Sequence, residues 1–168
     1  TYLACAVSRL SDYCNAFCTW NPQNENIRDL FQRQAIPMIW DFVEANPIDG
    51  KLTIETAAEW VVDGLTTLPL DGISGRVLQL DARLAEIDFE SPPIISTDTP
   101  YYDNNSYADL SDFFYIWLRK AIRKIYPNEF STLLTPKAPE LIVSPYRHDG
   151  SEEKARDHFR SGFGQVFN

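Results

Sequence analysis

Two short apolar runs, separated by an acidic connector, most constrain the fold of this chain. Residues 76–80 read Arg-Val-Leu-Gln-Leu and residues 93–97 read Pro-Ile-Ile-Ser-Thr, and each run has the length and composition of a short strand. Helical patterns flank both runs, and a short connection favours neighbouring strands in one sheet. We therefore predict an α/β fold with few short strands and a predominance of helices, in which residues 98–101 form a loop at the carboxyl end of these two strands.

Helical periodicity covers much of the remaining sequence. Thr53 is a suitable N-cap for one of these helices. Proline at position 37 interrupts another helical pattern, which predicts two short helices with a bend at Ala35 to Pro37. The predicted helices cover residues 2–18, 26–45 as the bent pair, 54–68, 107–125, 127–134 and 151–163, and residues 135–146 are predicted to be extended.

The charge distribution is uneven along the chain. The net charge of -9 argues against a nucleic-acid partner, because affinity for phosphate depends on Lys and Arg. Residues 1–103, however, hold 6 Lys and Arg against 16 Asp and Glu, whereas residues 104–168 hold 9 against 8. Any contact with a polyanion is therefore expected in the C-terminal part, around Arg119, Lys120, Arg123 and Lys124.

Cysteine content and hydropathy indicate the compartment. The three cysteines, Cys5, Cys14 and Cys18, are an odd number without a secretory signal, which is typical of reduced thiols in a cytosolic protein. Cys14 and Cys18 could share a helix face, but two further ligands are lacking nearby, so buried cysteines are favoured over a metal site. No apolar run approaches the ~20 residues that a bilayer crossing requires. We expect a cytoplasmic protein without a membrane partner.

The residues that directly follow the second apolar run are suited to chemistry on an amino group. A carboxylate at a strand end, here Asp98, can accept a hydrogen bond from an exocyclic amino group. Thr99 precedes Pro100 and is held extended, which directs its carbonyl outward as a second acceptor. Tyr101 supplies a flat ring on which a base that has left the duplex can stack. An ordinary turn is the alternative interpretation of these four residues.

The surrounding sequence resembles a known enzyme family. Residues 95–104, Ile-Ser-Thr-Asp-Thr-Pro-Tyr-Tyr-Asp-Asn, and the pattern over residues 107–119 are similar to the D-P-P-Y-Y-D-N region of the large bacterial adenine-specific DNA methylases that contain a zinc ribbon. Further similar segments are Phe31-x-Arg-Gln-Ala-Ile-Pro-Met38, Trp40-Asp41, Phe130-Ser-x-Leu-Leu-Thr-Pro-Lys137 and Tyr146-Arg-His148. Together these segments span most of the chain.

The resemblance implies transfer of a methyl group from S-adenosylmethionine to adenine N6 in DNA, with cytosine N4 as the second choice. Asp98 and the Thr99 carbonyl would bind the target amino group, Pro100 would shape the turn, and Tyr101 would stack on the flipped base. Asp81 would lie near the adenosine of the cofactor. The implied fold is a partial Rossmann-like methyltransferase sheet, with a helical segment over residues 1–70 and a partial catalytic domain over residues 71–168.

The sequence departs from the family pattern at several points. Thr99 replaces the first Pro of the motif, and Leu80 stands where Gly is expected. The glycine-rich cofactor loop and the zinc ribbon are absent, so we expect this chain to be a fragment whose missing N-terminal half belongs to the same parent chain. One alternative is a noncatalytic nucleic-acid-binding or assembly module. Another is amino methylation of RNA or of a protein glutamine, although Asn is usual in place of Asp98 for those substrates.

Overall fold

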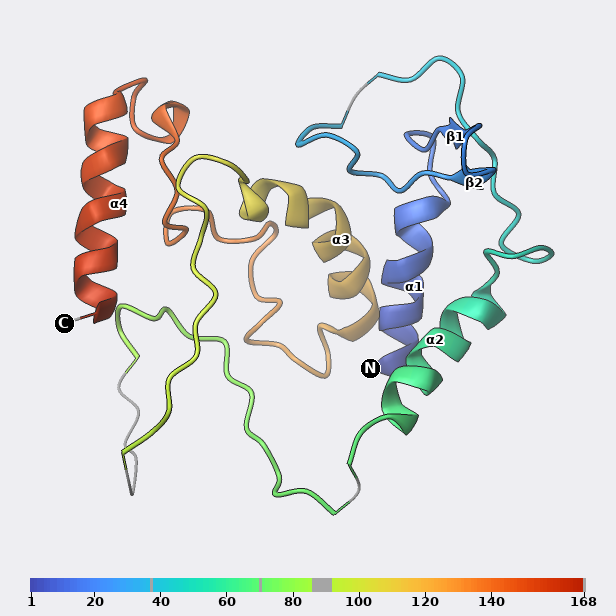
Figure 1. Cartoon of the computed structure of the whole chain (residues 1–168), viewed down its shortest axis with the longest axis horizontal. Helices are drawn as coiled ribbons and strands as arrows, with labels where there is room; N and C mark the ends of the chain where they lie inside the picture. Colours follow the sequence, from blue (N-terminus) through green and yellow to red (C-terminus); the bar gives the residue numbers. More distant parts are fainter. Residues whose placement is uncertain (37, 70, 86–91, 168) are drawn as a thin grey trace. The chain divides into compact units, whose positions relative to one another are not determined.

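The computed structural model describes residues 1–36, 38–69, 71–85 and 92–167 (Figure 1). Helices predominate in these residues, as predicted, and the described strands make one two-stranded antiparallel sheet. The elements are α1 (Tyr2–Tyr13), β1 (Trp20–Asn21), β2 (Asn26–Ile27), α2 (Ile54–Thr66), α3 (Tyr107–Ile122), the 3₁₀ helix η1 (Pro145–Arg147) and α4 (Glu152–Phe167). Two compact units are formed, one by Thr1–Gly75 with Asp109–Thr135 and the other by Arg76–Ala108 with Pro136–Asn168.

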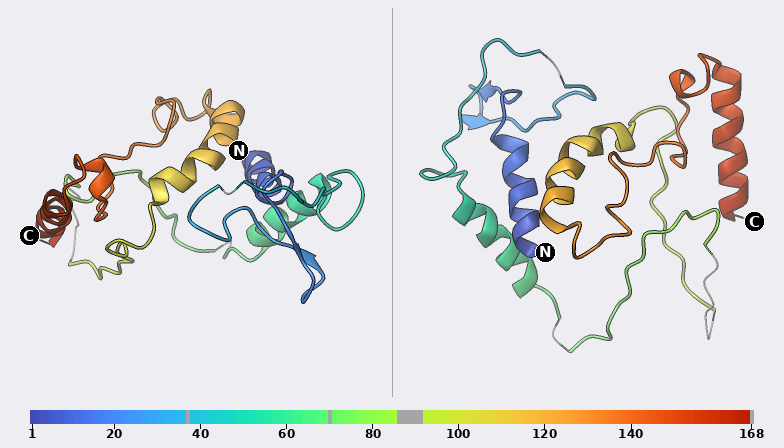
Figure 2. Two further views of the ribbon diagram at one scale, coloured as in Figure 1. Left: turned by 90° about the horizontal axis from the view of Figure 1, so that it is seen from above. Right: turned by 180° about the vertical axis from the view of Figure 1, so that it is seen from behind.

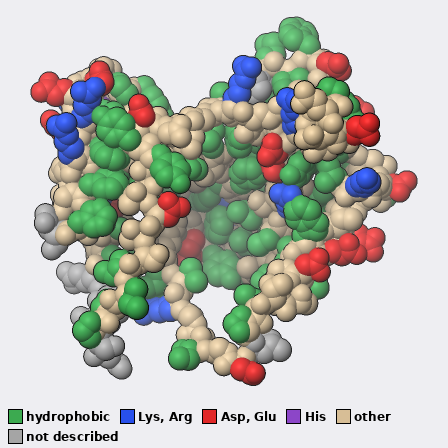
Figure 3. All heavy atoms as spheres, viewed as in Figure 1, with side chains coloured by type: hydrophobic (Ala, Val, Ile, Leu, Met, Phe, Trp, Pro, Cys, Tyr) green, Lys and Arg blue, Asp and Glu red, His purple; other side chains and the backbone are tan. Residues whose placement is uncertain are grey.

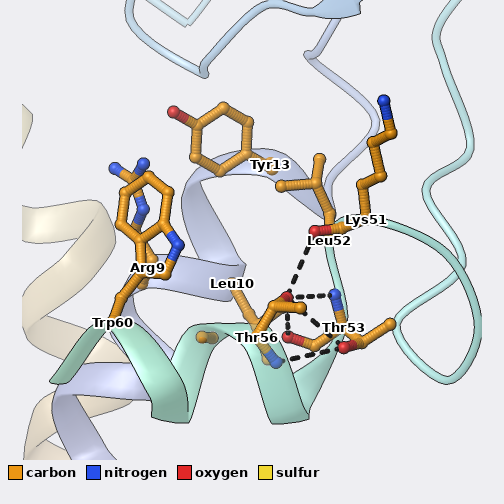
Figure 4. Close-up of a pocket in the computed structure, with 9 residues that line it drawn as sticks. Arg9, Leu10, Tyr13, Lys51, Leu52, Thr53, Thr56 and Trp60 are labelled. Atoms are coloured by element: carbon orange, nitrogen blue, oxygen red, sulfur yellow. Dashed lines mark hydrogen bonds between the residues drawn. The ribbon is translucent and has the colours of Figure 1, made fainter. Parts of the chain in front are cut away.

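Helices α1 and α2 pack side by side in the first unit (Figures 1 and 2). The Arg9 guanidinium of α1 lies 4.2 Å from the centre of the Trp60 ring of α2 and 4.8 Å from the centre of the Tyr13 ring (Figure 4). Helix α2 begins as predicted, because the Thr53 hydroxyl accepts a hydrogen bond from the Thr56 N–H and the Thr56 hydroxyl accepts one from the Thr53 N–H. This reciprocal cap satisfies donors that the first turn of a helix leaves unpaired.

The end of α1 joins the β1–β2 hairpin to the core of the first unit. Trp20 pairs with Ile27 and Asn21 with Asn26. The side chain of Leu30, which follows the hairpin, is fully buried, and its N–H donates to both the backbone oxygen and the carboxylate of Asp12.

Helix α3 brings aromatic side chains to the same unit. The Phe31 ring makes edge contacts with Phe113 and Phe114, at 6.3 and 5.9 Å between ring centres. Tyr115 is buried, stacks on Phe130 and donates from its hydroxyl to the Thr132 carbonyl at 2.9 Å. These contacts place Phe113, Phe114 and Tyr115 in the packing of the first unit, whereas Trp117 of the same helix is 42% exposed.

In the second unit, α4 packs on the buried segment 141–144. Ala155 and Gly162 are the buried residues of α4. A Cβ atom at Gly162 would lie 2.9 Å from Leu141 Cδ1, so the small residue allows the helix to approach Leu141 closely. Helix α4 therefore has a fixed position on this segment.

The prediction of two neighbouring strands at residues 76–80 and 93–97 is wrong. Both segments are irregular, and Val77 and Ile94 are 97% and 100% exposed. A strand is stable only when its backbone groups pair, and within the described ranges no ladder partner is provided for either segment. The acidic connector between them lies at residues 86–91, outside the described residues.

Three helix predictions also need correction. Helix α1 ends at Tyr13, not at residue 18, because the Asn15 side chain donates to the Ser11 and Asp12 carbonyls while its oxygen accepts the Phe17 N–H. The described residues of 26–45 contain no helix, and Pro37, with its predicted bend, lies outside the described residues. Residues 127–130 form a turn and residues 132–134 a bend. The boundaries of α2, α3 and α4 agree with the predictions to within a few residues.

Many large apolar side chains remain on the surface, and Figure 3 shows hydrophobic groups spread over the visible face. Trp40 is 90% exposed and Ile48 is 86% exposed. None of the helices in the described part of the chain combines the length and apolar composition needed to cross a membrane.

Candidate functional site

A cavity of about 320 Å³ in the second unit brings together most of the residues that the sequence singled out. Its volume is within the range of small-molecule sites in proteins. Four segments line it, namely residues 81–83, 97–100 and 139–141 together with Phe163, Val166 and Phe167 of α4. Asp81 and Asp98, predicted from separate segments, thus border one space.

Residues 97–100 contribute two threonines, Asp98 and Pro100 to the cavity lining. Asp98, Thr99 and Pro100 are all exposed. No hydrogen bond to the Asp98 carboxylate comes from any of the residues that the structure describes. The carboxylate is therefore accessible to an amino group that enters the cavity.

Tyr101 is placed differently from the three residues before it. Its side chain is 55% exposed, and it is not among the described residues that line the cavity. The Tyr101 carbonyl accepts the Asn104 N–H at 2.8 Å, which closes a turn directly after the loop. The structure thus brings together Asp81, Asp98, Thr99 and Pro100 but leaves the Tyr101 ring outside the lining.

Tyr102 holds this turn in place. Its φ angle is +40°, a left-handed conformation that is uncommon for a residue with a side chain. Its ring makes an edge contact with Phe159 of α4 at 5.1 Å, and its carbonyl accepts the Val143 N–H at 2.8 Å. Two independent contacts therefore maintain the strained residue, as is common next to functional loops.

Asp81 begins a turn and is engaged by Arg83. The Arg83 Nη2 atom lies 2.5 Å from Asp81 Oδ2, and Nε lies 3.0 and 3.2 Å from the two carboxylate oxygens. The Arg83 N–H donates to the same carboxylate at 3.0 Å. The side-chain bonds, and then the backbone bond, lower the pKa of Asp81 to about 2, so the group is ionised at neutral pH.

Glu140 connects the wall of the cavity to the start of α3. Its Oε1 atom accepts the Ala108 N–H at 3.0 Å, in the first turn of α3, and its Oε2 atom accepts Arg147 Nη1 at 2.7 Å. Arg147 also donates to the Lys137 carbonyl at 3.1 Å and to the Ser106 hydroxyl at 2.6 Å. This network fixes the chain that leaves the loop relative to residues 139–141.

One small cavity in the first unit and the cysteines are less suited to chemistry. The space between Arg9, Tyr13 and Trp60 in the first unit has a volume of only about 30 Å³, room for about one water molecule (Figure 4). Cys5, Cys14 and Cys18 are free; burial raises the pKa of the Cys14 and Cys18 thiols, which keeps them protonated. Among the described residues, no group of three or more His, Cys, Asp or Glu side chains could hold a metal ion.

Comparisons with models of protein families, with curated proteins and with solved structures found no match.

The sequence interpretation did not include the apolar wall from α4 or the Glu140–Arg147 pair. One signal for the wall was present, because Phe159, Phe163 and Phe167 recur at four-residue steps and so share a helix face. The pair gave no local signal, since its two residues are separated by an irregular segment.

Proposed function

We propose that this chain is part of an S-adenosylmethionine-dependent DNA methyltransferase that acts on adenine N6, with cytosine N4 as the second choice. The observation that carries the proposal is the cavity in which the exposed Asp98 carboxylate and Thr99 face an apolar wall. An acceptor beside an apolar surface is the combination that a flat ring with an exocyclic amino group requires.

The chemistry assigned to this chain is the holding and orientation of the amino group. Asp98 accepts one N–H of the target amine, and the Thr99 carbonyl accepts the other. This arrangement would fix the orientation of the amino group and expose its nitrogen lone pair, and the Asp98 carboxylate would be the nearby acceptor for a proton released from the nitrogen. Pro100 limits the conformations of the loop. In the complete enzyme we assign stacking on the flipped base to Tyr101, whose ring lies outside the cavity lining in this chain.

The residues around Asp81 do not fit a complete cofactor site. The Asp81 carboxylate, expected near the adenosine, is engaged by Arg83, and the chain has no glycine-rich loop between a strand and a helix. The residues present therefore do not supply a site for S-adenosylmethionine by themselves. The cofactor loop is assigned to the N-terminal half of the parent chain, which is the proposed partner of this segment.

The same parent would complete the sheet. Val77 and Ile94 are apolar and almost fully exposed, as expected of strands whose neighbours are supplied by other residues. In this proposal residues 76–80 and 93–97 become part of a Rossmann-like methyltransferase sheet once those neighbours are present. The loop of residues 98–101 then lies at the carboxyl end of the second strand, where α/β proteins bind their ligands.

The proposed DNA contact lies near the end of α3. Arg119, Lys120, Arg123 and Lys124 form the most basic stretch of the sequence; the last three are exposed, and Arg119 is half-buried. Clustered cations of this kind bind phosphates by releasing counterions. A cytoplasmic location belongs to the same proposal.

A noncatalytic nucleic-acid-binding or assembly module is the second candidate function. Thr99 favours it, because the family motif has proline at this position, and the ion pair of Asp81 with Arg83 favours it too. In such a module the loop would be retained for folding or pairing and not for chemistry.

Methyl transfer by the longer parent chain distinguishes the two functions. Asp98→Ala is expected to reduce the incorporation of tritiated methyl groups into DNA by roughly 10²-fold or more, since a positioned proton acceptor contributes about that factor. Asp103→Ala, five residues further along and outside the cavity lining, is the matched control and should retain activity. Near wild-type incorporation by Asp98→Ala would show that residues 98–101 are only a turn.

A further inference from the structure

We infer that Phe163 and Phe167 of α4 form the stacking wall for the aromatic ring whose amino group Asp98 accepts. The inference rests on the proposed function and deepens it, because it assigns residues of the C-terminal helix to recognition of the ring. Both phenylalanines line the cavity that Asp98, Thr99 and Pro100 border.

The aromatic side chains of α4 form a continuous row. Phe159 and Phe163 lie 4.5 Å apart between ring centres with an interplanar angle of 31°, and Phe163 and Phe167 lie 6.0 Å apart at 36°. The four-residue spacing places the three rings on one face of the helix. The row therefore extends from the contact with the loop into the cavity.

The loop and the row are held together at one end. Tyr102, directly after the loop, makes its edge contact with Phe159, the first ring of the row. Gly162 allows α4 to lie against Leu141, which also lines the cavity. The first contact places the row beside the residue that follows the loop, and the second places α4 against the lining of the same cavity.

Charge selects the chemical class of the ligand. Asp81, Asp98 and Glu140 are among the lining residues, but Asp81 is paired with Arg83 and Glu140 with Arg147. The Asp98 carboxylate is therefore the acidic group on the described lining that is not engaged in an ion pair. Such a border favours ligands that donate hydrogen bonds and disfavours anions. A flat, neutral ring with an exocyclic amino group meets both conditions, since its face stacks on phenylalanine and its N–H groups meet the carboxylate.

The test is titration of the ¹⁵N-labelled 168-residue chain with 9-methyladenine, followed by NMR chemical shifts. This probe has the ring and the amino group but lacks the sugar and the phosphate. Phe167→Leu keeps an apolar side chain and alters a ring that is 63% exposed, so the fold should be preserved. We expect Phe167→Leu and Phe163→Leu each to weaken binding of 9-methyladenine about tenfold, the usual value of one stacking contact. Phe167→Tyr keeps an aromatic ring and should bind as the unaltered chain does.

Phe113→Leu, in the other unit, is the control and should bind 9-methyladenine as the unaltered chain does. Unchanged binding by both α4 leucine variants, or no binding by the unaltered chain, would overturn the inference. The proposed function is tested separately by Asp98→Asn and by the 6-dimethylamino analogue of the probe. If Asp98→Asn binds 9-methyladenine more weakly and the unaltered chain binds the 6-dimethylamino analogue more weakly, while the α4 variants bind normally, the proposed function stands and the inference fails. If only the α4 variants weaken binding, the wall is confirmed and the role of Asp98 is wrong.

Discussion

Glu140 and Arg147 form an ion pair in which both side chains are largely removed from solvent. Arg147 Nη1 lies 2.7 Å from Glu140 Oε2, and only 12% of the arginine side chain and 14% of the glutamate side chain remain exposed. The pair also holds the first turn of α3 through the Ala108 N–H. The pair thereby joins Ser106 and Ala108, which follow the candidate loop of residues 98–101, to Glu140 on the cavity lining.

This pair predicts a large stability loss when one partner is removed. Arg147→Met should lower the free energy of unfolding by about 3 kcal/mol, because a mostly buried carboxylate loses its cation. Glu140→Gln/Arg147→Met should lose clearly less than the sum of the two single variants. Urea denaturation followed by circular dichroism gives the free energy of unfolding of the unaltered chain, Glu140→Gln, Arg147→Met and the double variant. Strictly additive losses would mean that the two side chains do not interact in solution.

The Asp81–Arg83 contact predicts an unusual titration. Asp81 should titrate with a pKa of about 2, well below the ordinary aspartate value of 3.8. Because the pKa is lowered in the folded chain, the stabilisation is fully present above pH 3.8 and is lost as the pH falls through about 2. NMR of the side-chain carboxyl carbon follows this titration directly. In Arg83→Gln the Asp81 pKa should return toward 3.8; the same titration in both proteins would contradict the ion pair.

Local sequence signals predicted the helices with strong periodicity. Helix α2 has both the apolar pattern and the Thr53 cap, and its N-terminus agrees with the prediction. Helix α1 has the pattern but no stop signal was recognised, so the competing hydrogen bonds of Asn15 were missed. Caps and periodicity act over a few residues, and they can be read from the sequence for that reason.

Strands depend on partners that are distant in the sequence, and there the prediction failed. Val77 and Ile94 have the composition of strand residues, but composition does not supply a neighbouring strand. The cavity shows the same limit. Asp81 and Asp98 were identified from their positions after apolar runs, whereas Phe163 joins them only through tertiary packing. The Glu140–Arg147 pair likewise depends on how an irregular segment folds back.

The missing glycine-rich loop predicts the behaviour of the isolated chain toward the cofactor. The 168-residue chain should show no measurable binding of S-adenosylmethionine, because the residues that would cradle the methionine end lie elsewhere in the proposed parent. Isothermal titration calorimetry measures this directly, with the parent chain as the positive control. Micromolar affinity in the isolated chain would place the cofactor site within these residues.

Tyr101 predicts a contrast between its ring and its hydroxyl group in the parent enzyme. Tyr101→Ala should weaken retention of the flipped base by ~1–3 kcal/mol, the usual contribution of one aromatic stack, whereas Tyr101→Phe should keep most of the activity. Fluorescence of a 2-aminopurine at the target position reports the flipped state, and methyl incorporation reports the chemistry. Equal losses in the two variants would assign the role to the hydroxyl group.

The motif with Thr99 in place of proline is expected to support methyl transfer in the parent enzyme. Thr99→Pro in the parent enzyme should leave methyl transfer intact or raise it, because it retains the backbone carbonyl that we assign to the substrate amine. It also stiffens the loop. No backbone hydrogen bond from the Thr99 N–H to another described residue is lost in the exchange.

Thr99→Ala is the matched control for this exchange, since it removes the side chain without stiffening the backbone, and it should match the unaltered enzyme. Initial rates of tritiated-methyl transfer to DNA compare the three proteins. A collapse of activity in Thr99→Pro alone would show that the loop requires a conformation or an N–H that proline forbids. A different outcome is that the unaltered enzyme, Thr99→Pro, Thr99→Ala and Asp98→Ala all transfer no methyl groups while DNA binding persists. The noncatalytic module would then be the correct function, because in that function the loop folds but carries out no chemistry.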